Sequence, residues 1–292
     1  MRLLVTGREG QLARSLALRG LDHAGIEVVA LGRPDLDLEQ PSSVARAIAA
    51  AQPDIVVNAA AYTAVDKAEQ EEDLAFAVNR DGAAAVARAA AELGVPLIHL
   101  STDYVYSGDK PEPYVESDPV APLGAYGRSK LAGEMAVREA HPGPLILRTS
   151  WVFSPFGNNF VKTMLRLGGE RDELRVVGDQ TGNPTSALDL AHAILRIAPD
   201  LAARPLEQRT LHLGGTGYVT WHGFAEHVFA CAGARGGPTP RVVAVPTSAY
   251  PTPARRPANS RLDCSAFTRD FGITRPDWRS GLAAILKELE TA

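Results

Sequence analysis

Three side chains between residues 101 and 130 have the types and the spacing needed for acid catalysis beside a carbonyl group. Tyr126 and Lys130 are four residues apart, so on a helix they lie on one face, about one turn from each other. An ammonium group close to a phenol favours the phenolate and lowers a pKa that is ordinarily about 10. Thr102 follows the apolar run Pro96–Leu100, which predicts a buried strand, so its hydroxyl can reach the same oxygen. We predict that Tyr126 gives a proton to a carbonyl that receives hydride, with Lys130 and Thr102 as its partners.

The same Tyr–Lys spacing also fits an ordinary surface helix. The segments that precede the pair favour the catalytic interpretation, because strands alternate with helices up to residue 150. Strands are predicted at 3–6, 26–31, 54–58, 96–100 and 145–149, and helices at 41–51, where Ser42 or Ser43 can act as the cap, and at about 73–93. This alternation predicts an α/β protein with a Rossmann-type, doubly wound parallel sheet.

The composition limits the class of protein. A chain of 292 residues with 45% hydrophobic and 22% charged residues is typical of one large domain or two coupled ones. The net charge of −4 and the lack of a basic block argue against a nucleic-acid partner. No apolar run reaches about 18 residues, so no membrane span is expected, and the strand-like start leaves no room for a signal peptide. Two cysteines and scattered histidines predict neither disulfides nor a metal site, and they fit a cytoplasmic protein.

A glycine turn between the first strand and the first helix is predicted to hold a dinucleotide phosphate. Gly7 and Gly10 allow a tight turn, and the helix that begins near Gln11 and Leu12 presents N–H groups to the pyrophosphate. An alanine stands where a third glycine is usual, and the spacing resembles the Gly-x-x-Gly-x-x-Gly variant of extended short-chain dehydrogenases. A plain strand-to-helix turn is the alternative.

The next two strand ends extend this cofactor site. No acidic residue stands at 31–34, and Arg33 can accommodate a 2′-phosphate, which favours NADPH over NADH, while Asp37 and Leu38 can flank the adenine. After the third strand, small side chains leave space for a cofactor against the backbone, although they also fit the start of an alanine-rich helix. These residues are Ala59, Ala60, Ala61, Tyr62 and Thr63.

The pattern changes after residue 150, where loops rich in aromatic, amide and proline residues replace the regular alternation. We predict a dinucleotide-binding domain at 1–150 and a smaller, mainly substrate-binding lid at 151–292, of which some segments return to the first domain. Three candidate substrate contacts in this region are Trp151, Asn159 and Gln180. Arg255, Arg256 and Arg261 can bind a diphosphate through bidentate contacts, and a solvated basic loop is the alternative.

These segments resemble one family over nearly the whole chain: the dTDP-4-dehydrorhamnose reductases, which are extended short-chain dehydrogenases/reductases. The matching segments are 7–12, 57–69, 101–106 (Ser-Thr-Asp-Tyr-Val-Tyr), 126–134 (Tyr-Gly-Arg-Ser-Lys-Leu-Ala-Gly-Glu), 148–153, 157–165, 179–185 and 246–262. The resemblance implies reduction of the 4-keto group of dTDP-4-dehydro-6-deoxy-L-mannose to dTDP-L-rhamnose by NADPH or NADH.

The resemblance also implies roles for individual residues. Tyr126 is expected to be the proton donor, and Lys130 to bind the nicotinamide ribose. Thr102, Asp103 and Trp151 resemble the residues that hold the deoxysugar. Some family members dimerise around Mg²⁺ bound by a glutamate of the first helix, but Ser15 stands at that position and is a poor ligand. We therefore expect no such metal, and the sequence is compatible with a homodimer or a monomer.

Two other functions fit the same fold. Related nucleotide-sugar dehydratases carry Thr-Asp-Glu at the position of Thr102–Tyr104, and Tyr104 cannot replace that glutamate in the elimination of water. A non-catalytic, nucleotide-binding regulatory subunit, such as the beta subunit of methionine adenosyltransferase, can keep the fold and lose the chemistry. The intact Thr102, Tyr126 and Lys130 favour the reductase.

Overall fold

A six-stranded parallel sheet forms the centre of the computed structural model, which describes residues 1–203 and 207–291. Its strands, in spatial order, are β2 (Glu27–Leu31), β1 (Arg2–Thr6), β3 (Ile55–Asn58), β4 (Leu97–Thr102), β5 (Leu145–Thr149) and β10 (Arg209–His212). Every neighbouring pair is parallel. The chain proceeds from β1 to one side and from β3 to the other, so the loops after these two strands diverge and open a crevice at the carboxyl ends.

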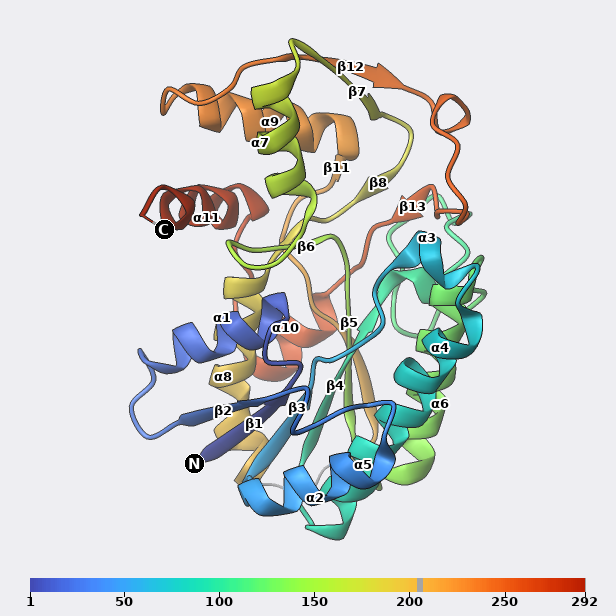
Figure 1. Cartoon of the computed structure of the whole chain (residues 1–292), viewed down its shortest axis with the longest axis vertical. Coiled ribbons are helices and arrows are strands. Elements are labelled where there is room, and N and C mark those ends of the chain that lie inside the picture. Colours follow the sequence, from blue (N-terminus) through green and yellow to red (C-terminus); the bar gives the residue numbers. More distant parts are fainter. Residues whose placement is uncertain (204–206, 292) are drawn as a thin grey trace.

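Helices cover both faces of this sheet (Figure 1). One face carries α1 (Gln11–Gly20), α8 (Ala187–Ala203) and α10 (Ser265–Phe271), and the other carries α2 (Pro41–Ala51), α5 (Ala83–Glu92) and α6 (Ala125–Ala140). Alternation along β1 explains this arrangement, because successive side chains of a strand point to opposite faces. Leu3 and Val5 belong to the core on the α1 side, whereas Leu4 belongs to the core on the α2 side. The predicted α/β fold with a doubly wound parallel sheet is confirmed.

One local prediction is confirmed and another was wrong. The helical stretch expected at about 73–93 is present, as α4 (Glu72–Phe76), a π-helical turn η1 (Ala77–Gly82) and α5 in direct succession. In the π-helical turn, Asn79 points inward, where its side-chain oxygen accepts a hydrogen bond of 2.8 Å from the Tyr62 N–H. Ser42 and Ser43 do not cap α2, which begins after Gln40, and the Ser43 hydroxyl instead bonds the Gln40 carbonyl oxygen at 2.8 Å.

The smaller part of the molecule stands above the carboxyl ends of the sheet in Figure 1. It contains the short strands β6 (Val152–Phe153), β7 (Glu173–Val177), β8 (Thr181–Gly182), β9 (Thr185–Ser186), β11 (Val219–Thr220), β12 (Arg241–Val245) and β13 (Asn259–Ser260), and the helices α7 (Phe160–Glu170), α9 (Trp221–Gly233) and α11 (Trp278–Thr291). Phe153, Met164, Phe224 and Trp278 are among its buried core residues. The segments α8, β10 and α10 also follow residue 150 but pack on or within the large sheet.

No helix within residues 1–203 and 207–291 is long and apolar enough to cross a membrane. Cys231 and Cys264 are both free.

Candidate active site

A cleft of about 940 Å³ lies at the carboxyl ends of the sheet strands. All the residues that the sequence predicts to contact the cofactor line it: Gly7, Gly10, Gln11, Leu12, Arg33, Asp37, Leu38, Ala59, Ala60, Ala61, Tyr62, Thr63, Tyr126 and Lys130. Thr102, Asp103 and Trp151 line the same cleft. The loops after β1, β2, β3, β4 and β5 therefore bring these residues together, as expected for ligands of a doubly wound sheet.

The glycine turn fits a pyrophosphate group because it presents bare backbone to the cleft. Gly7 has φ +83°, and a Cβ at this position would lie 3.1 Å from the Ala60 Cα, so only glycine allows the two loops to approach so closely. The Thr6 hydroxyl holds the second loop in place, since its oxygen accepts from the N–H groups of Ala59 (3.1 Å) and Ala60 (3.0 Å). Residues 59–64 form a loop and not the start of a helix.

A second arginine, which sequence reasoning missed, lies beside Arg33. Arg8 lines the cleft between the two glycines, donates a 2.6 Å hydrogen bond to the Arg33 carbonyl and forms a 3.1 Å ion pair with Asp35. The Arg33 side chain is 74% exposed and lies 3.7 Å from Glu39. Both cations stand at the end of β2, where an adenosine ribose binds in this fold. The sequence signal that could have identified Arg8 is its position as a basic residue inside the glycine turn.

Tyr126 and Lys130 lie in the first two turns of α6, and Lys130 is buried. The Lys130 ammonium donates a 2.7 Å hydrogen bond to the Leu100 carbonyl oxygen at the end of β4. Burial lowers the pKa of Lys130 to about 8, although the charge of Glu134 opposes this shift. The alternative of a surface helix with an exposed Tyr–Lys pair is therefore wrong.

The expectation that Lys130 lowers the pKa of Tyr126 is also wrong for this structure. Burial raises the pKa of Tyr126 to about 12, and the hydrogen bond between Tyr126 and Thr102 opposes the shift only in part. The ammonium bonds the Leu100 carbonyl, so it does not counter the loss of solvation at the phenol. Tyr126 consequently keeps its proton at neutral pH, which is the state that a proton donor requires.

A buried ion pair supports this part of α6 from beneath. Arg148 on β5 contacts Glu134 through two hydrogen bonds, of 2.8 Å and 2.7 Å, and both side chains are almost completely buried. Ser101 on β4 donates a further bond of 2.6 Å to Glu134. Burial would raise the pKa of Glu134, but Arg148 outweighs it and holds the pKa below the ordinary value. The pair thus ties α6 to the two strands that carry the catalytic end of the cleft.

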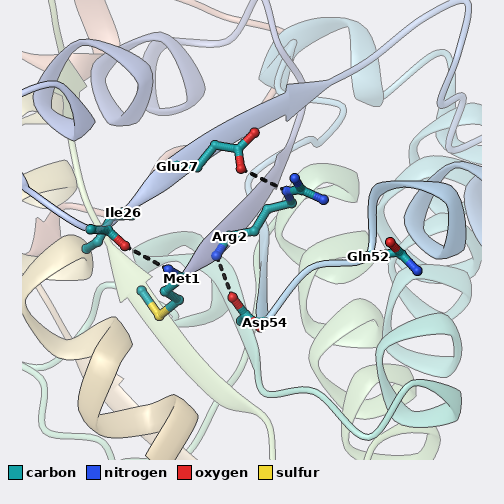
Figure 2. Close-up of a pocket in the computed structure, with 7 residues that line it drawn as sticks. Met1, Arg2, Ile26, Glu27, Gln52 and Asp54 are labelled. Atoms are coloured by element: carbon teal, nitrogen blue, oxygen red, sulfur yellow. Dashed lines mark hydrogen bonds and ion pairs between the residues drawn. The ribbon is translucent and has the colours of Figure 1, made fainter.

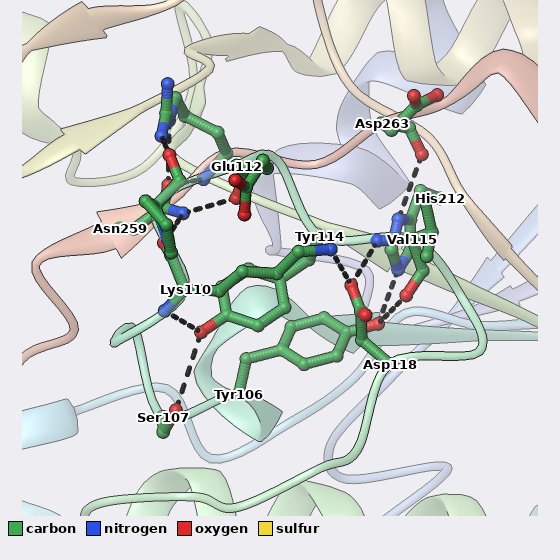
Figure 3. Close-up of polar contacts among 12 residues, drawn as sticks. Tyr106, Ser107, Lys110, Glu112, Tyr114, Val115, Asp118, His212, Asn259 and Asp263 are labelled. Atoms are coloured by element: carbon green, nitrogen blue, oxygen red, sulfur yellow. Dashed lines mark hydrogen bonds and ion pairs between the residues drawn. The ribbon is translucent and has the colours of Figure 1, made fainter.

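The same arginine also contacts a polar cluster, of which Figure 3 shows Tyr106, Tyr114 and His212. Arg148 donates to the Tyr106 hydroxyl at 2.7 Å, and this hydroxyl lies 2.7 Å from the His212 Nε2. The His212 Nδ1 lies 3.0 Å from the Asp263 carbonyl oxygen, which can only accept, so Nδ1 carries the proton and Nε2 accepts from Tyr106. Tyr106 also stacks on Tyr114, with 4.2 Å between ring centroids. This cluster connects the loop after β4 to β10.

Asp103 is the carboxylate nearest the catalytic group. It follows Thr102, whose hydroxyl donates to its Oδ1 at 3.0 Å; within the described part of the chain no hydrogen bond of good geometry reaches its buried Oδ2, although the Ser260 hydroxyl favours the charged carboxylate. Burial raises the pKa of Asp103 to about 6. An unsatisfied buried oxygen that borders the cleft is suited to accept a hydrogen bond from a ligand hydroxyl.

Three predicted substrate residues do not line the cleft. Asn159 caps α7, where its Oδ1 accepts from the Lys162 N–H at 3.2 Å. The Gln180 amide donates to the Thr247 hydroxyl at 3.1 Å. Arg256 forms an ion pair of 2.7 Å with Asp66, which also accepts from the Ala254 N–H. Their contact with substrate stays a prediction.

One amide joins the cofactor side of the cleft to the smaller part of the molecule. The Gln11 Oε1 accepts hydrogen bonds from the Ser154 hydroxyl, at 2.9 Å, and from the Asn159 amide, at 3.1 Å. Gln11 begins α1 directly after the glycine turn, and Ser154 and Asn159 flank the loop before α7.

A second hollow, of about 570 Å³, lies at the opposite, amino ends of the strands (Figure 2). Its polar residues bond one another: the Arg2 side chain pairs with Glu27 at 3.0 Å, and the Arg2 N–H donates to Asp54. None of the predicted site residues lines it. It is not a candidate site, because ligands of such sheets bind at the carboxyl ends.

Within residues 1–203 and 207–291, no group of three or more His, Cys, Asp or Glu side chains could hold a metal ion. Ser15, at the position where some family members carry a metal-binding glutamate, is fully buried, and its hydroxyl donates to the Gln11 carbonyl at 2.8 Å.

Comparisons with known proteins agree with this geometry. The family described as RmlD substrate binding domain matches residues 1–291. A dTDP-4-dehydrorhamnose reductase from Sinorhizobium fredii is 54% identical over 280 residues, which span 95% of this chain and 94% of that protein. The crystal structure of such a reductase from Clostridium acetobutylicum has a TM-score of 0.91 and 37% identity over 99% of this chain and 100% of that chain. A further structure, from Bacillus anthracis in complex with NADP, has a TM-score of 0.89 and 38% identity over 98% of this chain and 99% of that one. Because this chain matches the family over its full length and at such identity, it belongs to the dTDP-4-dehydrorhamnose reductase family.

Proposed function

We propose that this protein reduces the 4-keto group of dTDP-4-dehydro-6-deoxy-L-mannose to a hydroxyl, which yields dTDP-L-rhamnose, with NADPH as the reductant. The observation that carries the proposal is the meeting of Thr102, Tyr126 and Lys130 in one cleft with the glycine turn. Relatives that match the full length of the chain are named for this reaction. The non-catalytic alternative is not favoured, because every residue that the chemistry requires is present in the cleft.

The residues of this chain divide the chemistry in a simple way. NADPH, when bound, supplies a hydride to C4 of the sugar. Tyr126 donates its proton to the C4 oxygen as the carbonyl becomes a hydroxyl, and the Thr102 hydroxyl orients this exchange through its bond to the phenol. Lys130, whose pKa of about 8 leaves it charged at neutral pH, would bind the nicotinamide ribose through its ammonium group. Solvent then returns a proton to the Tyr126 oxygen.

The site assignments of the sequence analysis are part of this proposal. Thr102, Asp103 and Trp151 would hold the deoxysugar, and the unsatisfied Asp103 oxygen supports a bond to a sugar hydroxyl. Asn159 and Gln180 would contact the nucleotide only if they left their present partners. Arg256 stands next to Tyr104, which lines the cleft, so it needs only to leave Asp66 to reach a phosphate. Residues 1–150 would form most of the dinucleotide-binding domain, and 151–292 most of the substrate-binding domain.

The cofactor preference can be tested at Arg8 and Arg33. Because both cations stand at the end of β2, we expect Arg33→Ala and Arg8→Ala each to raise the KM for NADPH roughly tenfold, with little change for NADH. Initial rates with each cofactor measure this difference. Arg19→Ala, a partly exposed cation far along α1, is the control. Equal effects on the two cofactors would show that the arginines do not bind the 2′-phosphate.

The central experiment follows the absorbance of NADPH after addition of the keto sugar, generated in situ. We expect oxidation that depends on the sugar and gives dTDP-L-rhamnose. Binding of NADPH without any oxidation would contradict the proposal and favour a regulatory protein.

We also infer a cytoplasmic location, which the two free cysteines support. A homodimer and a monomer are both compatible with the chain, and light scattering distinguishes them.

A further inference from the structure

Two indole rings lie face to face in the wall of the cleft. The ring centroids of Trp151 and Trp221 are 3.4 Å apart and the planes differ by 8°. Both residues line the cleft that contains Tyr126 and Lys130. Trp151 follows β5 of the large sheet, whereas Trp221 begins α9 in the smaller part of the molecule. The stack therefore joins the two parts of the molecule at the site itself.

Trp151 has an unfavourable backbone conformation that must be held by its surroundings. Its φ is +49°, and among the described residues other than glycine only Gln52 also has a positive φ. The neighbouring Ser150 is fixed by its hydroxyl, which donates to the Asn183 carbonyl at 2.9 Å, and the Trp151 carbonyl accepts from the Thr185 N–H at 3.1 Å. Strained residues of this kind persist only where the fold over-determines them, and they are concentrated at functional sites.

Gly182 packs against the same indole. A Cβ on Gly182 would lie 2.5 Å from Cε2, 2.8 Å from Nε1 and 2.9 Å from Cζ2 of Trp151, so no other residue fits there without moving the ring. Trp221 supplies the other contact, and it is itself held by Phe160, with ring centroids 4.6 Å apart, and by its place after the cap residue Thr220. The position of Trp151 is thus determined from two sides.

We propose that Trp221 is a positioning residue for the reduction: it stacks on Trp151 and, together with Gly182, fixes the indole that forms the sugar side of the cleft. The inference rests on the proposed function. Trp221 acts through Trp151 and not on the reacting atoms, so its removal should affect use of the sugar nucleotide while binding of NADPH is preserved. Substrates of the class that fits this wall are keto sugars attached to a nucleoside diphosphate.

The test combines a spectroscopic and a kinetic readout. Stacked indoles produce an exciton couplet in far-ultraviolet circular dichroism, and we expect Trp221→Leu to abolish it. The same variant should lower kcat/KM for the sugar nucleotide by about tenfold, mainly through KM, because one aromatic pair contributes up to about a factor of ten. The dissociation constant of NADPH should be unchanged. In a Trp151→Leu background, the Trp221 substitution should have a smaller effect, as expected for residues that act as a unit.

A second variant avoids the tryptophans. Gly182→Ala places a methyl group against the Trp151 ring and should lower kcat/KM in the same way with Trp221 intact. Gly169→Ala is the matched control, because a Cβ at this position of α7 meets nothing within 4 Å.

If the couplet disappears in Trp221→Leu but kcat/KM stays at the wild-type value in both test variants, the positioning role is overturned. A couplet that survives in Trp221→Leu overturns the stack. A wild-type protein that binds NADPH but does not oxidise it with the sugar contradicts the proposed function instead.

Discussion

The two walls of the cleft are built in different ways. On the sheet side, β4 and β5 run in register, with Thr102 opposite Thr149, and one helix adds Tyr126 and Lys130. On the other side, short strands and loops from distant parts of the chain meet, and the predicted substrate residues Asn159, Gln180 and Arg256 each bond another group of the protein. Strand ends and one helical turn therefore place functional groups by local geometry, whereas the second wall depends on long-range contacts such as the Trp151–Trp221 stack.

The sharpest test of the sheet-side wall is Tyr126→Phe. Only the proton donor is lost, so kcat should fall by about 10²- to 10⁴-fold while the affinity for NADPH is kept. Steady-state rates and a cofactor titration measure the two quantities. Tyr250→Phe, at an exposed phenol, is the control and should behave like wild type. Full activity in Tyr126→Phe would show that Tyr126 is not the proton donor and that the sheet-side wall does not carry the chemistry assigned to it.

The support beneath this wall can be tested by unfolding. Glu134→Gln leaves the buried Arg148 without its counter-charge, and we expect the free energy of unfolding to fall by about 3–5 kcal/mol. Glu170→Gln, at an exposed ion pair with Arg166, should change it by less than about 1 kcal/mol. Urea titrations with equal m-values measure both changes. Equal, small losses would mean that the buried pair does not hold α6 on the sheet.

A substitution at Arg256 tests whether a residue of the second wall leaves its present ion pair to bind the substrate. If the diphosphate attracts Arg256 away from Asp66, Arg256→Met should raise the KM for the sugar nucleotide by about tenfold and leave kcat nearly unchanged. Arg241→Met, at an exposed cation of β12 that was not a candidate diphosphate ligand, is the control. An unchanged KM in Arg256→Met would assign this arginine to the ion pair alone.

The smallest expected effect concerns Asp103, between the two walls. Its pKa is raised from 3.8 to about 6 in the folded protein, so the folded state binds this proton more tightly than the unfolded chain. The ionised carboxylate costs stability above that pKa, and the cost disappears as the pH falls towards the unfolded value. Asp103→Asn should therefore be more stable than wild type near neutral pH, and the difference should shrink in acid. A difference that is independent of pH would contradict the raised pKa.

The sequence predicts much of the sheet-side wall because its signals are local. The spacing of Tyr126 and Lys130, the two glycines and the small residues after β3 each depend on fewer than about ten neighbouring positions, and helix and strand geometry place them. The protonation of Tyr126 could not be predicted in the same way, because it depends on burial and on the Leu100 carbonyl that binds Lys130.

The second wall was harder to predict for a physical reason. Trp221 lies seventy positions after Trp151, and long-range contacts such as the pairing of β11 with β8 bring them together. Asn159 and Gln180 have the amide chemistry of ligand contacts, but a helix cap and a hydroxyl partner can use the same groups. The residue type alone cannot distinguish a ligand contact from a hydrogen bond within the protein, since both satisfy the same amide donors and acceptors.

The amide of Gln11 has a thermodynamic consequence. It lines the cofactor side of the cleft and accepts hydrogen bonds from Ser154 and Asn159, so any movement of Gln11 on cofactor binding is transmitted to the loop before α7. Linkage makes such coupling reciprocal: the nucleotide must alter the affinity for the cofactor by the same factor by which the cofactor alters the affinity for the nucleotide. Calorimetric titration of dTDP with and without NADP⁺ measures that factor, and Gln11→Leu should reduce it towards one. The strength of the coupling between the two binding sites would then depend on one side chain at the start of α1.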